Sequence, residues 1–291
     1  MITDFRLQVF VTTARVLSFT RAAEELNVSQ PAVTKHIKEL EKMLSVALFR
    51  RGGSRIKLTE EGERLLPLVQ GVLQGYMAIN DAVAISSGDY SGRLRIGASS
   101  TIAQYILPDI LAKFRLQYPS IEIVLMGGNS EEILLGLEQE RIDIALVEDA
   151  HTSSAFHYEH FAQDSVVLVS SNKRPQQVSL EEVREMPLVL RENGSGTLDV
   201  IERELMKHNI TRRMLNVQIQ IGSSEGIMRY LIATKCYAFI SRAAVGAYLK
   251  RGELYMVDID GVEIARSLRF ATLHGRSNRL SELFKEYCNN F

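Results

Sequence analysis

The sequence contains no tryptophan, only two cysteines and no long apolar segment. Cys236 and Cys288 lie far apart and outside any CxxC pattern, which argues against a disulfide scaffold and against a zinc module. No run of 18 or more apolar residues is present, so we expect no membrane-spanning helix. The N-terminus lacks a basic start followed by an apolar run and a small-residue cleavage site. These absences predict a soluble, cytoplasmic protein.

The composition of the chain is that of an ordinary globular protein. Its 291 residues are 46% hydrophobic and 24% charged, with 19 glycines and 6 prolines. These values exclude a disordered, collagen-like or repeat-dominated chain. The length suits two or three domains.

Charge is distributed unevenly along a chain whose net charge is only −1. Residues 1–65 carry 11 Lys and Arg against 8 Asp and Glu, whereas residues 66–291 carry 23 against 27. The basic excess is concentrated between Arg21 and Lys57, with 8 basic against 4 acidic residues. A basic segment on an acidic body indicates contact with a polyanion, and a solvated basic face is the alternative.

The first part of the chain shows two short helical patterns separated by a tight break. The first pattern begins behind Ser18 or Thr20, either of which can cap a helix. Ser29 then caps a second helix that has Pro31 in its first turn, where the missing N–H is harmless. Two helices joined by such a short connection predict a helix-turn-helix.

A turn and a long helix follow. A Gly-Gly-Ser turn between two short β-compatible stretches, within residues 48–58, predicts a basic wing. From Thr59 to about Ser87 the pattern is helical, and its apolar stripe needs a partner surface. A second copy of the chain is the expected partner of this stripe, which consists of Leu65, Leu66, Val69, Val72, Leu73, Tyr76, Ala82 and Val83.

From Arg93 onward, short strands alternate with helices, one of them predicted over residues 102–117. This alternation predicts a mainly parallel sheet with helices on both faces. The segment around His151, His157 and His160 is predicted to be an irregular loop. A metal site there is the alternative, but no Cys or carboxylate stands at ligand spacing. We therefore expect neither a metal nor a cofactor.

Several motifs carry a resemblance to a known family. Residues 18–62 resemble the N-terminal domain of LysR-type transcriptional regulators, and they read SFTRAAEELNVSQPAVTKHIKELEKMLSVALFRRGGSRIKLTEEG. The segments LRIGAS, LPDILAKFRLQYP, RIDIALVE and SSEGIMRYLIA resemble the effector domain of the same family.

The resemblance implies a domain organisation. Residues 1–58 would form a winged helix-turn-helix DNA-binding domain, and residues 59–89 a linker helix that dimerises. Residues 90–291 would form an effector domain of two Rossmann-like α/β halves around a ligand cleft. The first half would comprise residues 90–162 and 267–291, and the second residues 163–266. A homodimer or homotetramer on double-stranded DNA is expected.

The start of the second short helix carries the side chains expected to read DNA. Such a helix lies in the major groove with its N-terminal residues against base edges. Gln30 can pair with adenine, Lys35 can reach guanine acceptors, and Thr34 offers a hydroxyl or a methyl group. Pro31 can contact a thymine methyl group, although its role at the helix start is sufficient to explain it.

Other basic and polar residues nearby are expected to contact the DNA backbone. Phosphate contacts position a protein without specifying the sequence. By resemblance, Arg55 is the minor-groove arginine of the wing. The remaining backbone contacts are assigned to Ser29, His36, Lys38, Arg51 and Lys57.

Two further segments place hydroxyl groups at the starts of predicted helices, Gly97-Ala-Ser-Ser-Thr101 and Glu192-Asn-Gly-Ser-Gly-Thr197. Free N–H groups at a helix start favour an anion, whereas simple helix capping is the alternative. If the segments face each other, a small carboxylate or oxyanion fits between them. Glu148 would disfavour a highly charged anion. The candidate effector residues are Ser99, Ser100, Thr101, Asn129, Glu148, Ser195, Gly196 and Thr197.

One motif points to a different class of protein. Gly222-Ser-Ser-Glu-Gly226 matches G-x-S-x-G between a strand and a helix, with Asp258 or Asp260 and then His274 in hydrolase order. No HGGG-like oxyanion loop precedes the motif, and Ser224 also lies in the SSEGI stretch of the LysR resemblance. A serine hydrolase and an effector-independent architectural DNA-binding protein are therefore the alternatives. The prediction is a LysR-type transcriptional regulator, not an enzyme, controlled by a small anionic effector.

Overall fold

A computed structural model describes residues 3–52, 55–87, 90–148, 153–173, 177–274 and 278–289. The chain divides into two compact units, Met1–Asp89 and Tyr90–Phe291. Among the helices in these ranges, none is both long enough and apolar enough to cross a membrane.

The first unit contains the predicted helix-turn-helix. Its elements are α1 (Phe5–Val16), α2 (Phe19–Leu26), α3 (Gln30–Leu44), β1 (Phe49–Gly52), β2 (Arg55–Leu58) and α4 (Glu60–Ser87). Ser18 caps α2 through a hydrogen bond from the Arg21 N–H, and Ser29 caps α3 through one from Ala32. Between them, Asn27 ends α2 with a φ of 53°. Asparagine tolerates this left-handed conformation, so the chain can turn within three residues.

The core of the first unit is shared by all four helices. Val9, Phe10, Ala22, Val33 and Ile37 are among its buried residues. Small Ala22 and Ala23 on α2 are both buried and allow close helix contact. β1 and β2 form an antiparallel hairpin after α3, which is the predicted wing.

The apolar residues of α4 divide into two groups. Leu65, Leu66, Val69 and Leu73 pack on the core of their own unit. Leu68, Val72 and Ile79 are 67%, 48% and 49% exposed. The predicted dimerisation stripe was therefore wrong in part, because several of its members are used within one chain. The side chains of Ala82 and Val83 lie outside the described part.

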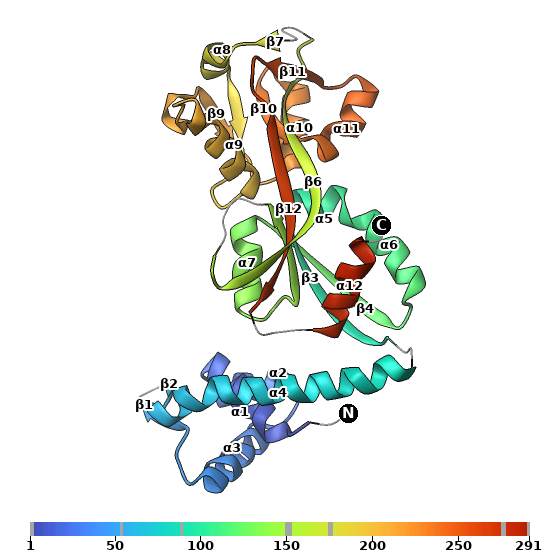
Figure 1. The fold of residues 1–291 in the computed structure, drawn as a ribbon. Coiled ribbons are helices and arrows are strands. Elements are labelled where there is room, and N and C mark those ends of the chain that lie inside the picture. Colours follow the sequence, from blue (N-terminus) through green and yellow to red (C-terminus); the bar gives the residue numbers. More distant parts are fainter. Residues whose placement is uncertain are drawn as a thin grey trace. The chain divides into compact units, whose positions relative to one another are not determined.

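The second unit is an α/β structure with two lobes (Figure 1). Its sheet follows the order β4-β3-β5-β12-β6-β10-β8-β9, and β11 pairs with β6 and β7. The strands are β3 (Gly92–Ser99), β4 (Ile121–Gly128), β5 (Ile144–Glu148), β6 (Phe156–Ser170), β7 (Gln177–Val178), β8 (Leu188–Leu190), β9 (Val217–Gln220), β10 (Tyr237–Ser241), β11 (Tyr255–Ile259) and β12 (Ile264–Leu273).

Each lobe has its own core, and the two long strands β6 and β12 run from one lobe to the other (Figure 1). Lobe I contains α5 (Ser100–Tyr105), α6 (Leu107–Gln117), α7 (Ser130–Glu138) and α12 (Arg279–Asn289). Lobe II contains α8 (Leu180–Glu185), α9 (Gly196–Lys207), η1 (Arg212–Met214), α10 (Ser224–Ala233) and α11 (Arg242–Arg251).

The sheet combines two parallel groups, β3–β5 and β8–β10, with the strands β6 and β12, which pair antiparallel with each other and with their neighbours. Two local predictions were wrong. The helix predicted over 102–117 is broken at Ile106, since Pro108 begins a new helix and cannot continue the old one. His157 and His160 lie on the strand β6 instead of on a loop, and β12 pairs with both. His151 lies outside the described residues.

Candidate DNA surface and effector cleft

The start of α3 presents an exposed polar face. Ser29, Gln30, Pro31, Lys35 and Lys38 are all exposed. The Gln30 Nε2 amide donates to Thr34 Oγ1 at 2.9 Å, so these two side chains lie together as their spacing predicted. Amide, hydroxyl and ammonium groups on one exposed helix face can address base edges and phosphates.

His36 is placed differently from its neighbours. Its ring packs edge-on against Phe5, with 5.3 Å between the ring centroids. Nδ1 lies 3.6 Å from a carboxylate oxygen of Glu39, and 29% of the side chain is exposed. Packing against Phe5 directs His36 toward the core of the unit, whereas Lys38 remains exposed.

The wing contributes a second basic surface. Lys57 on β2 and Arg50 on β1 are exposed. Arg51 and Arg55 occupy strand positions, with Arg51 opposite Ile56 and Arg55 opposite Gly52. The side chains of Arg51 and Arg55 lie outside the described part of the structure.

In the second unit, the first predicted hydroxyl segment lies at the end of β3 and the start of α5. Ser99, Ser100 and Thr101 are all buried. Ser99 occupies the N-cap position of α5 but makes no capping hydrogen bond. Its Oγ instead donates to Glu148 Oε1 at 2.9 Å. The Ser100 hydroxyl is buried and has no hydrogen-bond partner among the described residues.

The second predicted segment lies at the start of α9, in lobe II. Ser195 occupies the N-cap position of α9 and also makes no capping hydrogen bond. The Gly196 N–H donates to Ser130 Oγ at 3.2 Å, and Thr197 Oγ1 accepts from Arg266 Nη1 at 2.8 Å. Simple capping therefore does not explain Ser99 or Ser195. Asn129, in contrast, forms a complete capping box at the start of α7.

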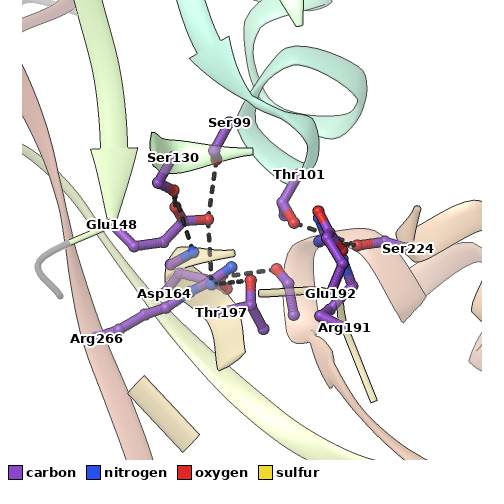
Figure 2. Close-up of polar contacts among 12 residues, drawn as sticks. Ser99, Thr101, Ser130, Glu148, Asp164, Arg191, Glu192, Thr197, Ser224 and Arg266 are labelled. Atoms are coloured by element: carbon purple, nitrogen blue, oxygen red, sulfur yellow. Dashed lines mark hydrogen bonds and ion pairs between the residues drawn. The ribbon is translucent and has the colours of Figure 1, made fainter. Parts of the chain in front are cut away.

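Glu148 at the end of β5 connects the two segments (Figure 2). Its Oε2 accepts from Ser130 Oγ at 2.6 Å, and its Oε1 lies 3.4 Å from Arg266 Nη1. Only 3% of Glu148 is exposed. A buried carboxylate of this kind is tolerated because hydrogen bonds and a cation compensate for lost hydration.

Two buried arginines complete the polar interior of the cleft. Arg266 pairs with Asp164 at 2.7 Å, and Ser241 Oγ donates to the same carboxylate. Arg191 pairs with Glu192 at 2.8 Å. Buried arginines are rarely found without such partners. Arg266 thus holds two acidic partners, Glu148 and Asp164, in the buried interior.

Several of these residues were not predicted from the sequence, namely Ser130, Asp164, Arg191 and Arg266. One signal was available for Arg266. Alternation along β12 places it on the same buried face as Ile264 and Leu268. A basic residue at a buried strand position requires an acidic partner, but the identity of that partner depends on the fold.

A tyrosine of lobe I contacts lobe II at a second place. Tyr105 on α5 and Tyr248 on α11 donate hydroxyl hydrogen bonds to the two oxygens of Glu225, at 2.9 and 2.8 Å. Burial and the contact with Glu225 raise the pKa of Tyr105 well above its usual value. Hydrogen bonds from Arg229 and Tyr248 lower the pKa of Glu225. The pair therefore consists of a neutral donor and an ionised acceptor at neutral pH.

The residues of the hydrolase alternative do not converge. Ser224 is buried, and its Oγ lies 3.3 Å from both Thr101 Oγ1 and Arg191 Nη1 (Figure 2). The ring of His274 packs near that of His157 at 6.1 Å, at the far end of β12. The basic side chain next to Ser224 is therefore Arg191, and an arginine cannot accept the proton of a serine nucleophile.

Comparisons with known proteins agree with this architecture. The family model described as "Bacterial regulatory helix-turn-helix protein, lysR family" matches residues 5–63, and the LysR substrate binding domain matches residues 87–291. The transcriptional regulator CfxR of Cupriavidus necator is 34% identical over 280 residues, covering 95% of this chain and 86% of CfxR. The transcriptional activator CmpR of Synechocystis is 30% identical, covering 95% and 90%.

Solved structures show the same fold. A full-length OxyR variant of Pseudomonas aeruginosa has a TM-score of 0.74 at 19% identity, covering 99% of this chain and 95% of OxyR. The CcmR regulatory domain of Synechocystis, solved with 2-PG, has a TM-score of 0.62 at 24% identity and covers 68% and 96%. The predicted fold class is confirmed. The serine hydrolase alternative is wrong, since the chain belongs to the LysR family of transcriptional regulators.

Proposed function

We propose that this regulator reads DNA through the start of α3 and is controlled by a small anion in the cleft of the second unit. The observation that carries the anion assignment is the convergence of Ser99 Oγ, Ser130 Oγ and Arg266 on one carboxylate. Donors arranged in this way, at the starts of two helices, stabilise negative charge.

In the DNA-binding role, Gln30, Thr34 and Lys35 address base edges. Pro31 lies beside them and can contact a thymine methyl group. Phosphate contacts come from Ser29, Lys38 and the wing residues Arg51, Arg55 and Lys57. His36 is a weaker phosphate candidate, because its ring packs on Phe5. A protein with this role acts where the chromosome lies, in the cytoplasm.

The regulator binds DNA as a homodimer or homotetramer in this proposal. Dimers of helix-turn-helix proteins contact two half-sites about one helical turn apart. Residues 1–58 read DNA, residues 59–89 dimerise, and residues 90–291 bind the effector. Leu68, Val72 and Ile79 recur on α4 at helical spacing and are exposed, so they form the proposed subunit contact.

The effector cleft lies between Ser99–Thr101 on one side and Ser195–Thr197 on the other. The unpartnered hydroxyl of Ser100 is available to a ligand oxygen. Glu148 is part of the same site, and Asn129 supports it as the cap of α7. The similar CcmR domain was solved with the small molecule 2-PG, which supports a ligand role for this fold.

The DNA part of the proposal is tested with a duplex selected by the protein from a random pool. Fluorescence anisotropy compares this duplex with a random one of equal length. The wild type should prefer the selected duplex by at least about 1000-fold at fixed salt. Equal affinity for both duplexes would refute sequence-specific reading and support the alternative of an architectural DNA-binding protein.

The anion part is tested by thermal unfolding with phosphate, sulfate and small carboxylates at constant ionic strength. A ligand of the folded state raises the midpoint steadily with concentration. Thr197→Val should weaken that response because it removes a hydroxyl from the cleft. Ser179→Ala is the matched control, since Ser179 caps α8 through a complete capping box outside the cleft. An equal response in both variants would refute the anion cleft.

A further inference from the structure

We propose that Glu148 is an internal occupant of the anion site, and that an effector anion must displace it in order to bind. The anion site is defined here by Ser99 Oγ, Ser130 Oγ and the guanidinium group of Arg266. This inference rests on the proposed anion cleft and specifies how it is regulated. It explains why a cleft built from anion-binding groups contains an acidic residue at its centre.

The contacts of Glu148 are those expected of a bound carboxylate ligand. Each of its oxygens accepts a hydroxyl hydrogen bond, from Ser99 at 2.9 Å and from Ser130 at 2.6 Å. Arg266 supplies a cation 3.4 Å from Oε1. The carboxylate thus makes charge-assisted hydrogen bonds of the strong class.

The site has no room for two anions. A Cβ atom added at Gly196 would lie 2.5 Å from Glu148 Oε2 and 2.6 Å from Ser130 Oγ. The backbone of α9 therefore closes directly over the carboxylate. An oxyanion that uses the same donors has to replace Glu148, so the two compete for a single position.

Charge leads to the same conclusion. Arg266 already has two acidic partners, Glu148 and Asp164, and its side chain is fully buried. A further anion would add a third negative charge around one cation in a medium of low polarity, which is strongly unfavourable. Once Glu148 leaves, the anion takes over its place beside Arg266 and the charge balance is preserved.

Space for the displaced side chain is present next to the site. Glu148 also lines a cavity of about 520 Å³ together with Phe156 and Leu134. Glu131 and Glu138 line the same cavity, so a displaced Glu148 acquires like charges as neighbours. Repulsion between these carboxylates favours the position of Glu148 beside Arg266. The binding free energy of the effector anion has to exceed the free energy of moving Glu148 into the cavity.

Displacement of Glu148 alters a contact between the lobes. Glu148, Ser99 and Ser130 belong to lobe I, whereas Arg266 lies where β12 passes between the lobes and holds Thr197 of α9. Replacing a carboxylate tethered to lobe I by a free anion removes a direct link between lobe I and Arg266. The lobes then have two arrangements, one with Glu148 on Arg266 and one with the anion there. An anion that binds one arrangement more tightly shifts the populations toward it.

The test is calorimetric titration of the full-length protein with inorganic phosphate at pH 7.5 and constant ionic strength. Glu148→Gln removes the competing charge, and phosphate should bind at least 10-fold more tightly than to the wild type. Glu148→Asp keeps the charge on a shorter side chain and should give an intermediate gain of about 3-fold. If the Gln variant does not fold, the Asp variant alone decides the outcome.

Glu225→Gln is the matched control, because Glu225 is another carboxylate that links the lobes, through Tyr105, but lies outside the anion site. Its phosphate affinity should stay within 2-fold of the wild type. Adding Ser99→Ala to Glu148→Gln should lower the gained affinity at least 5-fold, which locates the phosphate at the anion site.

The outcomes separate this inference from the proposed function. If the wild type and the Glu148 variants bind phosphate equally well and Ser99→Ala weakens binding, the anion cleft stands and displacement of Glu148 is refuted. An equal gain in Glu225→Gln also refutes it, because the effect would then be a general loss of negative charge. If no variant binds phosphate, both the inference and the proposed anion site fail.

Discussion

At the start of α3 the polar side chains are exposed and their contacts are local, whereas in the cleft they are buried and their contacts span the chain. Gln30 and Thr34 are separated by four positions. In the cleft, the hydrogen-bonded residues Ser130 and Glu148 are 18 positions apart in the sequence, and Thr101 and Ser224 are 123 positions apart. Exposed groups can exchange a local contact or water for a partner, whereas buried groups have to satisfy one another. This difference agrees with the proposed roles of the two surfaces, DNA for the first and a small molecule for the second.

The largest expected effect breaks the buried network. Arg266→Met should lower the free energy of unfolding by about 3–5 kcal/mol, because Glu148 and Asp164 would remain buried without their cation. Urea unfolding measures this loss. Arg251→Met removes an exposed pair with Glu253 and should cost less than about 1 kcal/mol. Similar losses in both variants would contradict the contrast between buried and exposed pairs.

The two groups of apolar residues on α4 provide the next test. Val72→Asp places a charge on the exposed face and should weaken the dimer by at least about 2 kcal/mol, roughly 30-fold in Kd, with a folded monomer. Leu73→Ala should instead lower unfolding stability, since Leu73 packs on the core of its own unit. Sedimentation and urea unfolding distinguish the two. An unchanged dimer in Val72→Asp would assign dimerisation to another surface.

On the exposed surface, base readout and phosphate contact can be separated. Gln30→Ala should cost about 1–3 kcal/mol on the selected duplex and little on random DNA. Lys38→Ala should weaken both duplexes alike and reduce the dependence of affinity on salt, since it removes one phosphate contact. Equal losses on both duplexes for Gln30→Ala would show that it does not read bases.

The smallest expected effect concerns the cysteines. Cys288 packs in the core of lobe I and Cys236 in lobe II, so they cannot form a disulfide with each other. Burial raises the pKa of the Cys288 thiol to about 12. Because the thiolate is the reactive form, Cys288 should react about 100-fold more slowly with DTNB in the native than in the unfolded protein. Cys236 is also buried, so its packing should shield it from the reagent in the native protein. Rapid reaction in the native protein at neutral pH would contradict this burial.

The contrast between the surfaces also explains what the sequence could predict. The helix-turn-helix depends on local signals, such as the caps Ser18 and Ser29 and the proline that follows Ser29. The first half of β6 was predicted as a loop because its strand character comes from pairing with β12, more than 100 residues away.

In the cleft, the sequence predicted which segments begin helices but not what their hydroxyls contact. Ser99 and Ser195 stand at N-cap positions, and only the fold shows that neither makes the capping bond. Glu148 is a second example: its negative charge alone is unfavourable for an anion site, and only the fold shows that Ser99, Ser130 and Arg266 surround it.

The most direct test of the account is the affinity of wild-type protein for the selected duplex as the concentration of a cleft-binding anion rises. The anion is the one that raises the thermal midpoint most, and its occupancy is measured by calorimetry under the same conditions. In the proposed mechanism the anion and DNA act on one conformational equilibrium, so linkage requires DNA affinity to change in step with occupancy. We predict at least a 5-fold change between empty and saturated protein. A cleft that saturates while DNA affinity stays within 2-fold would contradict the account.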